Sequence, residues 1–100
     1  MKTKPSILLI EDDVNIATGL QKVMQAHGYE VATLNRGDDG LAQAAAHPFD
    51  VVITDLKLPG LDGLELVRQL HQTKPKLPII LITAHGSTEI AIEATKWGAF

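Results

Sequence analysis

The stretch that decides the fold is VVITDLKLPGLDG, residues 51–63. Its first four residues are apolar or β-branched without polar alternation, which is typical of a parallel strand buried on both faces. An acid, Asp55, follows the run at once, and Pro59, Gly60 and Gly63 make the rest of the segment a loop. A carboxylate at the tip of a buried strand raises the question of what else lies near that tip.

The same kind of apolar run occurs three more times. SILLI (residues 6–10) and PIILIT (78–83) resemble DVVIT (50–54), which overlaps the opening stretch. YEVATL (29–34) is a weaker version that Glu30 and Ala32 interrupt. We therefore predict four strands, with the weak run as an edge strand.

Between the runs, apolar residues recur with the period of a helix. We expect each of the following stripes to face the core: Ile16, Leu20, Val23 and Met24; Leu41, Ala44 and Ala45; Leu66, Val67 and Leu70; and Ile90, Ala91, Ala94 and Trp97. Asp13, Asp62 and Ser87 are the predicted N-caps, and Gly28 is predicted to end the first helix.

Alternating strands and helices predict an α/β fold with a doubly wound parallel sheet. With the weak second strand at an edge and right-handed crossovers, the predicted strand order is 2-1-3-4. Ligands of such sheets bind beyond the carboxyl ends of the strands, where strand order reverses. Glu11 and Asp12 follow the first strand and Asp55 ends the third, so we expect these acids to converge there.

Length and composition describe one domain able to bury a modest core: 100 residues, 45% apolar and 21% charged. The absence of cysteine excludes a disulfide framework and a thiolate zinc site, and it fits a cytoplasmic protein. A net charge of -3 with scattered Lys and Arg gives no basic surface for direct nucleic-acid contact. The amino-terminal residues predict neither a signal peptide nor a membrane span.

Like-charged carboxylates that meet in one pocket either raise a pKa or recruit a cation. Mg²⁺ suits such a site, because it binds one or two carboxylates together with waters and phosphate oxygens. A carboxylate in this setting is also a nucleophile toward phosphorus, and Asp55 is the best candidate. Thr83, at the end of the fourth run, offers a hydroxyl to a phosphoryl oxygen from the other side.

Three segments, ILLIEDD, VVITDLKLPGLDG and ILITAHG, resemble in order and spacing the signature segments of response-regulator receiver domains of two-component signalling, which have a flavodoxin-like fold. The resemblance spans essentially the whole chain. It implies that Asp55 is the phosphoacceptor and that Glu11 and Asp12 serve the metal, with Asp12 the more direct ligand. It also implies that the Lys57 backbone carbonyl is the remaining metal ligand and that Thr83 is the switch hydroxyl.

The resemblance implies a phosphoprotein that takes its phosphoryl group from a histidine kinase or phosphotransfer protein in a bacterial phosphorelay. The resemblance also implies an acceptor that assists its own phosphorylation and dephosphorylation and is not a turnover enzyme. The switched surface would lie around the fourth helix and control an output domain beyond residue 100. TAHGSTEIAIEATKWGAF (83–100) looks most like receivers of enhancer-binding, NtrC-type transcriptional activators, so the expected output is DNA-binding, and a dimer is compatible with the family.

One departure from the family concerns its fifth strand, which carries an invariant lysine, and its fifth helix. The sequence has no counterpart of either, so residues 1–100 are expected to be a receiver domain that is incomplete at its carboxyl end and part of a longer protein. A fourth strand without that neighbour is expected to present an apolar edge.

Two further side chains are candidates for tuning the lifetime of an aspartyl phosphate. Lys57 lies two residues beyond Asp55, and His85 lies two residues beyond Thr83, so both could flank the phosphoryl group. The alternative for both is a solvated loop position.

Three functions are alternatives to a phospho-accepting receiver. The first is a pseudo-receiver that only binds proteins, which the missing lysine favours. A phosphohydrolase of the haloacid-dehalogenase type requires an acid where Lys57 stands. A dinucleotide-binding module requires a Gly-rich turn where EDDVN (11–15) stands.

Overall fold

The computed structural model describes residues 4–82 of the chain. The described elements alternate between strand and helix along the sequence, as predicted. They are β1 (Ser6–Ile10), α1 (Val14–Ala26), β2 (Glu30–Leu34), α2 (Gly37–Ala46), β3 (Val51–Asp55), α3 (Gly63–Thr73) and β4 (Ile79–Ile82). The strands form one parallel sheet in the order β2-β1-β3-β4, which confirms both the fold class and the predicted strand order.

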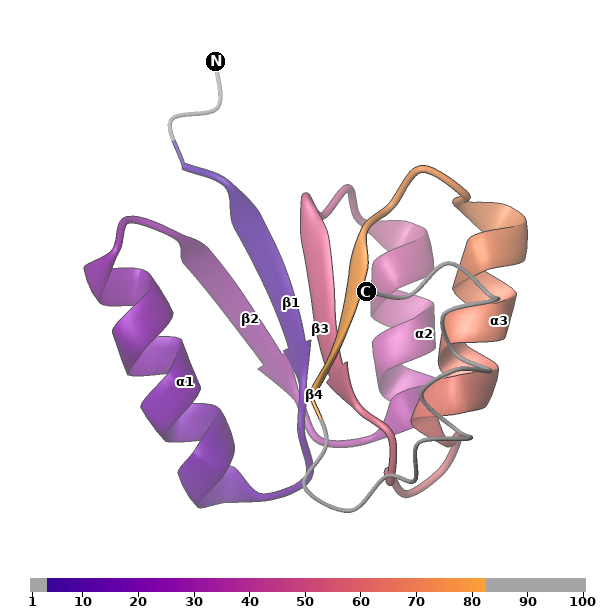
Figure 1. The fold of residues 1–100 in the computed structure, drawn as a ribbon, viewed down its shortest axis with the longest axis horizontal. Coiled ribbons are helices and arrows are strands. Elements are labelled where there is room, and N and C mark those ends of the chain that lie inside the picture. Colours follow the sequence, from indigo (N-terminus) through magenta and orange to yellow (C-terminus); the bar gives the residue numbers. More distant parts are fainter. Residues whose placement is uncertain (1–3, 83–100) are drawn as a thin grey trace.

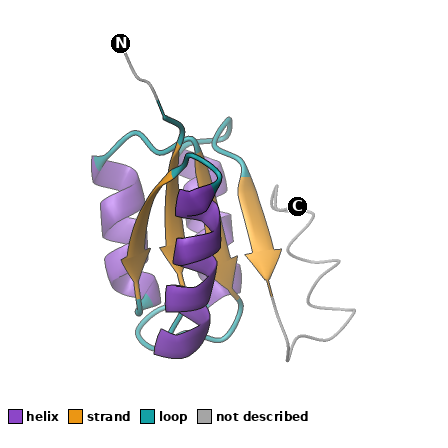
Figure 2. Cartoon of the chain, turned by 90° about the vertical axis from the view of Figure 1, so that its left-hand side faces the viewer, coloured by secondary structure: helices purple, strands orange, loops and turns teal. Residues whose placement is uncertain are grey.

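The helices cover the two faces of the sheet unequally. Figure 1 shows α1 on one face and α2 and α3 on the other. In Figure 2, which looks from the α1 side, this helix stands in front of the sheet, and on this side β4 has no described helix over it. The exposure of Ile80 agrees, since 39% of this β4 residue is accessible.

The main core lies between the sheet and the pair α2 and α3. Its fully buried members are Leu8, Ile10, Ala44, Val52, Leu66, Val67, Leu70 and Ile79. The predicted stripe of α3 is therefore confirmed, because all three of its residues are buried. Each buried Leu, Ile or Val side chain of this layer contributes about 1.5–3 kcal/mol through removal from water.

The predicted stripe of α1 is wrong for two of its four residues. Ile16 is 46% exposed and Val23 is 57% exposed, whereas Ala17 is buried and Leu20 and Met24 are half-buried. Residues 17, 20 and 24 share one face, and positions 16 and 23 lie about 70–90° from the middle of that face. In α2, Ala45 is likewise exposed while its neighbour Ala44 is buried.

The predicted helix ends are confirmed where the structure describes them. Asp13 caps α1 by accepting hydrogen bonds from the amides of Asn15 and Ile16 at 2.9 and 3.1 Å. Asp62 caps α3 by accepting from the Glu65 amide at 2.9 Å. Gly28 follows α1 with φ +92°, a left-handed conformation that favours glycine.

Some predictions lie outside the described residues: the fourth helix with its Ser87 cap, and the two side chains Thr83 and His85. None of the helices within residues 4–82 combines the length and the apolar character that a membrane span requires.

Candidate functional site

The carboxyl ends of β1 and β3 bring the predicted acids together. These strands are neighbours, with Ile10 opposite Thr54, so Glu11 follows β1 at the level where Asp55 ends β3. Carboxylate oxygens of Glu11, Asp12 and Asp55 all lie within 4.8 Å of one another. The predicted convergence is therefore confirmed.

The three acids differ in their access to solvent. Glu11 is 5% exposed, Asp55 is half-buried and Asp12 is exposed. Burial raises the pKa of the Glu11 carboxyl above its ordinary value of 4.5, and the hydrogen bond with Asp12 and the charges of Asp55 and Asp12 raise it further. The Asp13 amide, which donates to Glu11 Oε2 at 3.2 Å, acts in the opposite direction. The ionised form of Glu11 is therefore disfavoured in this site, and a bound cation would stabilise it.

The backbone fixes the direction of the Asp55 side chain. Its Oδ1 accepts a hydrogen bond from the Leu56 amide at 2.7 Å. The Thr54 hydroxyl, buried in the sheet, donates to the Asp55 carbonyl oxygen at 2.9 Å. The Leu56 amide therefore holds the carboxylate, while Thr54 holds the backbone of Asp55.

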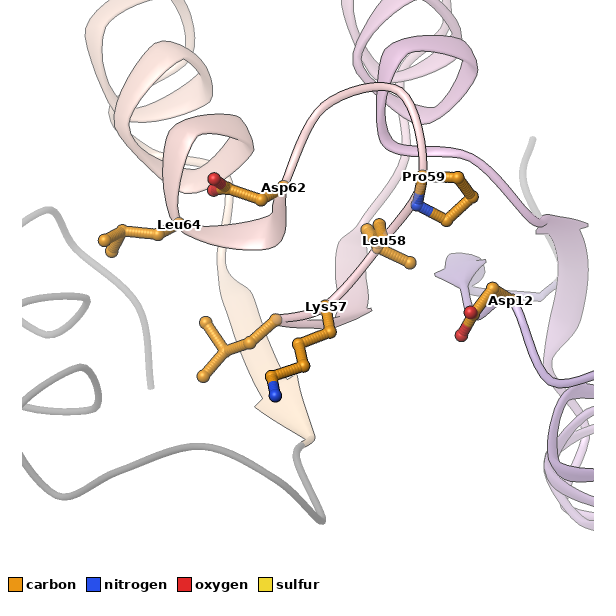
Figure 3. Close-up of a pocket in the computed structure, with 7 residues that line it drawn as sticks. Asp12, Lys57, Leu58, Pro59, Asp62 and Leu64 are labelled. Atoms are coloured by element: carbon orange, nitrogen blue, oxygen red, sulfur yellow. The ribbon is translucent and has the colours of Figure 1, made fainter.

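A pocket of about 560 Å³ adjoins the acids. It is lined by Asp12, Leu56, Lys57, Leu58, Pro59, Asp62 and Leu64. Figure 3 shows Asp12 on one side of the pocket, Asp62 and Leu64 on the other, and Lys57 between them. The pocket is wide enough for a small phosphodonor or a partner side chain to approach the end of β3.

The donor set fits a hard divalent cation. Three carboxylates at the ends of two strands supply only oxygen atoms, which Mg²⁺ and Ca²⁺ prefer over nitrogen or sulfur. Lys57 lies in the loop after β3, two residues beyond Asp55, and lines the adjoining pocket. Thr83 and His85 lie outside the described residues, so their predicted roles stay predictions.

The sequence interpretation missed one contact of this site. The first residue of α2 touches the loop that follows Asp55, through a hydrogen bond from the Gly37 amide to the Pro59 carbonyl at 3.0 Å. The paired glycines of NRGDDG (35–40) were the available signal, because close backbone approach often requires glycine.

Comparison with known proteins agrees with this geometry. The family model described as the response regulator receiver domain matches residues 7–100. The chain is 41% identical over 97 residues to the C4-dicarboxylate transport transcriptional regulatory protein DctD of Pseudomonas aeruginosa, covering 94% of this chain and 20% of that protein. It is 35% identical over 94 residues to the DNA-binding transcriptional regulator NtrC of Salmonella typhimurium, covering 94% of this chain and 20% of that protein.

A solved structure shares the fold over almost the whole chain. It is a response regulator protein from Burkholderia pseudomallei with a phosphorylated aspartic acid, a calcium ion and citrate. It is 30% identical, with a TM-score of 0.87, covering 96% of this chain and 56% of the other.

The curated relatives are about five times longer than the matched region, since this chain spans about a fifth of their length. Their names confirm the resemblance to receivers of NtrC-type transcriptional regulators. With the family model matched from residue 7 onward and the parallel sheet in the order 2-1-3-4, this chain belongs to the response-regulator receiver domain family.

Proposed function

We propose that this receiver accepts a phosphoryl group on Asp55 from a histidine kinase or phosphotransfer protein. The observation that carries the proposal is the convergence of three carboxylates within 4.8 Å at the ends of β1 and β3, beside a pocket that Asp12 and the two residues after Asp55 help to line. The Burkholderia pseudomallei relative supports it, because that structure contains a phosphorylated aspartic acid and a calcium ion.

The chemistry is a displacement at phosphorus. A carboxylate oxygen of Asp55 forms the new P–O bond while the P–N bond of the donor phosphohistidine breaks. The electron pair of that bond stays on the imidazole nitrogen, which then takes a proton from solvent. The Leu56 amide holds Oδ1 of Asp55, so the attacking group enters the reaction with a fixed direction.

Glu11, Asp12, Asp55 and the carbonyl of Lys57 are the residues that would hold the metal. Bound Mg²⁺ supplies neutralisation of the negative charge on the phosphoryl oxygens. Without a cation, the acids of the site would repel an incoming phosphoryl group.

The response to phosphorylation involves side chains on two loops. Thr83 is the proposed switch hydroxyl, which moves toward the phosphoryl group and biases the surface around the fourth helix. Lys57, exposed on the pocket wall, and His85 are proposed to tune the lifetime of the aspartyl phosphate. In a full-length receiver, replacement of both by Ala should change the dephosphorylation rate, and an unchanged rate would contradict that role.

The proposed setting is the cytoplasm of a bacterium, with a DNA-binding output domain beyond residue 100 as the controlled partner. The names of the curated relatives, both of them transcriptional regulators, support this setting. The domain acts as a phosphoacceptor and not as a turnover enzyme, because each transfer leaves the protein itself modified.

The test is uptake of one phosphoryl group. The chain is incubated with acetyl phosphate and Mg²⁺ or with EDTA, and its intact mass is measured while circular dichroism checks folding. We expect a gain that requires Mg²⁺, that Asp55→Asn abolishes, and that the matched variant Asp62→Asn retains, because Asn is an equally good N-cap for α3. A folded chain that gains nothing would contradict the proposal and favour a pseudo-receiver.

A further inference from the structure

The first turn of α2 packs against the loop that follows Asp55. We call residues 36–40 the α2 turn and residues 56–62 the acceptor loop. The Gly37 amide in the α2 turn donates to the Pro59 carbonyl in the acceptor loop at 3.0 Å. These two segments are not neighbours in the sequence, so the contact is purely tertiary.

Gly37 is the position where the approach is closest. A Cβ atom at this residue would lie 1.6 Å from the carbonyl oxygen of Leu61 and 2.6 Å from its carbonyl carbon. Both are backbone atoms, so no side-chain rotation relieves the clash. Restoring even a 3.0 Å separation from that oxygen requires a shift of about 1.4 Å, the difference between 3.0 and 1.6 Å.

The acceptor loop also has a glycine at this contact. Gly60 has φ +82°, and a Cβ there would lie 2.4 Å from Asp38 Oδ1 and 2.8 Å from Arg36 Nη2. Asp38 and Arg36 are joined by two hydrogen bonds of 3.1 Å, so the ion pair that faces Gly60 is itself held in place. Each segment therefore has a glycine at a point of closest approach to the other.

The α2 turn also packs against the strand that carries the other acids. A Cβ at Gly40 would lie 2.4 Å from Cδ1 of Ile10, the last residue of β1 and the one before Glu11. The turn thus contacts both segments that supply the acidic site. It sits between the end of β1 and the loop that carries the Lys57 carbonyl.

We propose that Gly37 is a positioning residue, through which the α2 turn holds the acceptor loop, and with it the Lys57 carbonyl, in register with Glu11, Asp12 and Asp55. The inference rests on the proposed function, because it concerns the same cation. Mg²⁺ tolerates little deviation from octahedral geometry, and a loop displaced by more than 1 Å no longer presents its carbonyl correctly.

The first experiment compares Mg²⁺ affinity in Gly37→Ala and wild-type protein by isothermal titration calorimetry. Residues that orient metal ligands typically change metal affinity by roughly tenfold to a hundredfold, and we expect a loss in that range. The matched control is Gly19→Ala, a helical glycine whose added Cβ meets nothing within 4 Å, and it should bind as the wild type does. Urea unfolding of both variants separates the affinity loss from a loss of stability.

Two outcomes would contradict the inference in distinguishable ways. A folded Gly37→Ala variant that binds Mg²⁺ as tightly as the wild type would overturn the positioning role and leave the proposed function intact. Wild-type protein that does not bind Mg²⁺ would overturn both.

A second measurement needs no variant and so does not depend on whether Gly37→Ala folds. Openings of the acceptor loop that release the cation should be suppressed about tenfold when Mg²⁺ is present at ten times its Kd. Hydrogen exchange of the Gly37 amide, which donates across the contact, should slow by about that factor. The His47 amide at the far end of α2 donates to Gln43 and should not respond. An unchanged Gly37 exchange rate would contradict the proposal.

Discussion

Replacing Asp55 by Asn should stabilise the metal-free protein, even though it removes the proposed phosphoacceptor. In the wild type, three carboxylates have oxygens within 4.8 Å of one another, and no described lysine or arginine forms an ion pair with them. Asn has the same shape as Asp and keeps an Oδ1 acceptor for the Leu56 amide, which donates at 2.7 Å. The substitution therefore removes charge repulsion and leaves the local hydrogen bond in place.

The size of the effect follows from Coulomb's law. Two unit charges at 4.8 Å repel by about 0.9 kcal/mol at the dielectric constant of water and by about 3.5 kcal/mol at an effective value of about 20. Asp55 is half-buried and Asp12 is exposed, so the true environment lies between these limits. We expect Asp55→Asn to gain about 1–3 kcal/mol in free energy of unfolding at neutral pH and low salt.

Urea unfolding in EDTA measures this gain, with Asp62→Asn as the matched control. That control removes the same charge outside the cluster and should change stability by less than about 0.5 kcal/mol. Adding Mg²⁺ at ten times its Kd should stabilise the wild type by about 1.4 kcal/mol and Asp55→Asn by much less. An Asp55→Asn variant no more stable than the wild type in EDTA would refute the repulsion on which the metal site is argued.

Three further predictions concern stability. Leu66→Ala should cost about 2–5 kcal/mol in urea unfolding, because Leu66 is fully buried between α3 and the sheet; a smaller loss would place the core elsewhere. Lys74→Ala should cost about 1–2 kcal/mol in free energy of unfolding, because its ammonium donates to two carbonyls at the end of α2, at 2.6 and 3.2 Å. The exposed control Lys76→Ala should cost little, and equal losses would argue against a stabilising role for these two hydrogen bonds. Burial raises the pKa of Glu11 in the folded protein, so the folded state binds this proton more tightly than the unfolded state does. The resulting stabilisation is complete below pH 4.5 and is lost as the pH rises through the raised pKa of the folded state. In EDTA, the stability advantage of Glu11→Gln over wild type should therefore grow across that range, and a difference independent of pH would contradict it.

The sequence was sufficient to predict the sheet and the acidic cluster because both depend on local patterns. Unbroken apolar runs identify buried parallel strands, and the weak run at residues 29–34 marks the edge strand, which the structure confirms as β2. Once the strand order is known, Glu11 and Asp55 have to meet, since parallel strands carry their carboxyl ends at one edge of the sheet.

The parts that could not be predicted depend on contacts between distant segments. The period of α1 indicates an apolar side, but it does not say that the helix rests on Ala17 and turns Ile16 and Val23 toward solvent. The fit of Gly37 against Leu61 could not be predicted either, because the glycines of residues 35–40 permit a close approach but are equally compatible with an ordinary turn.

The most direct test of the central claim is to locate the phosphoryl group within the chain. After incubation with acetyl phosphate and Mg²⁺, borohydride reduction converts an aspartyl phosphate into homoserine, and peptide mass spectrometry then identifies the converted residue. We predict homoserine at position 55 and no conversion when EDTA replaces Mg²⁺. Conversion at another acid, or an unmodified Asp55 in a folded chain that has bound Mg²⁺, would contradict the claim that Asp55 is the phosphoacceptor.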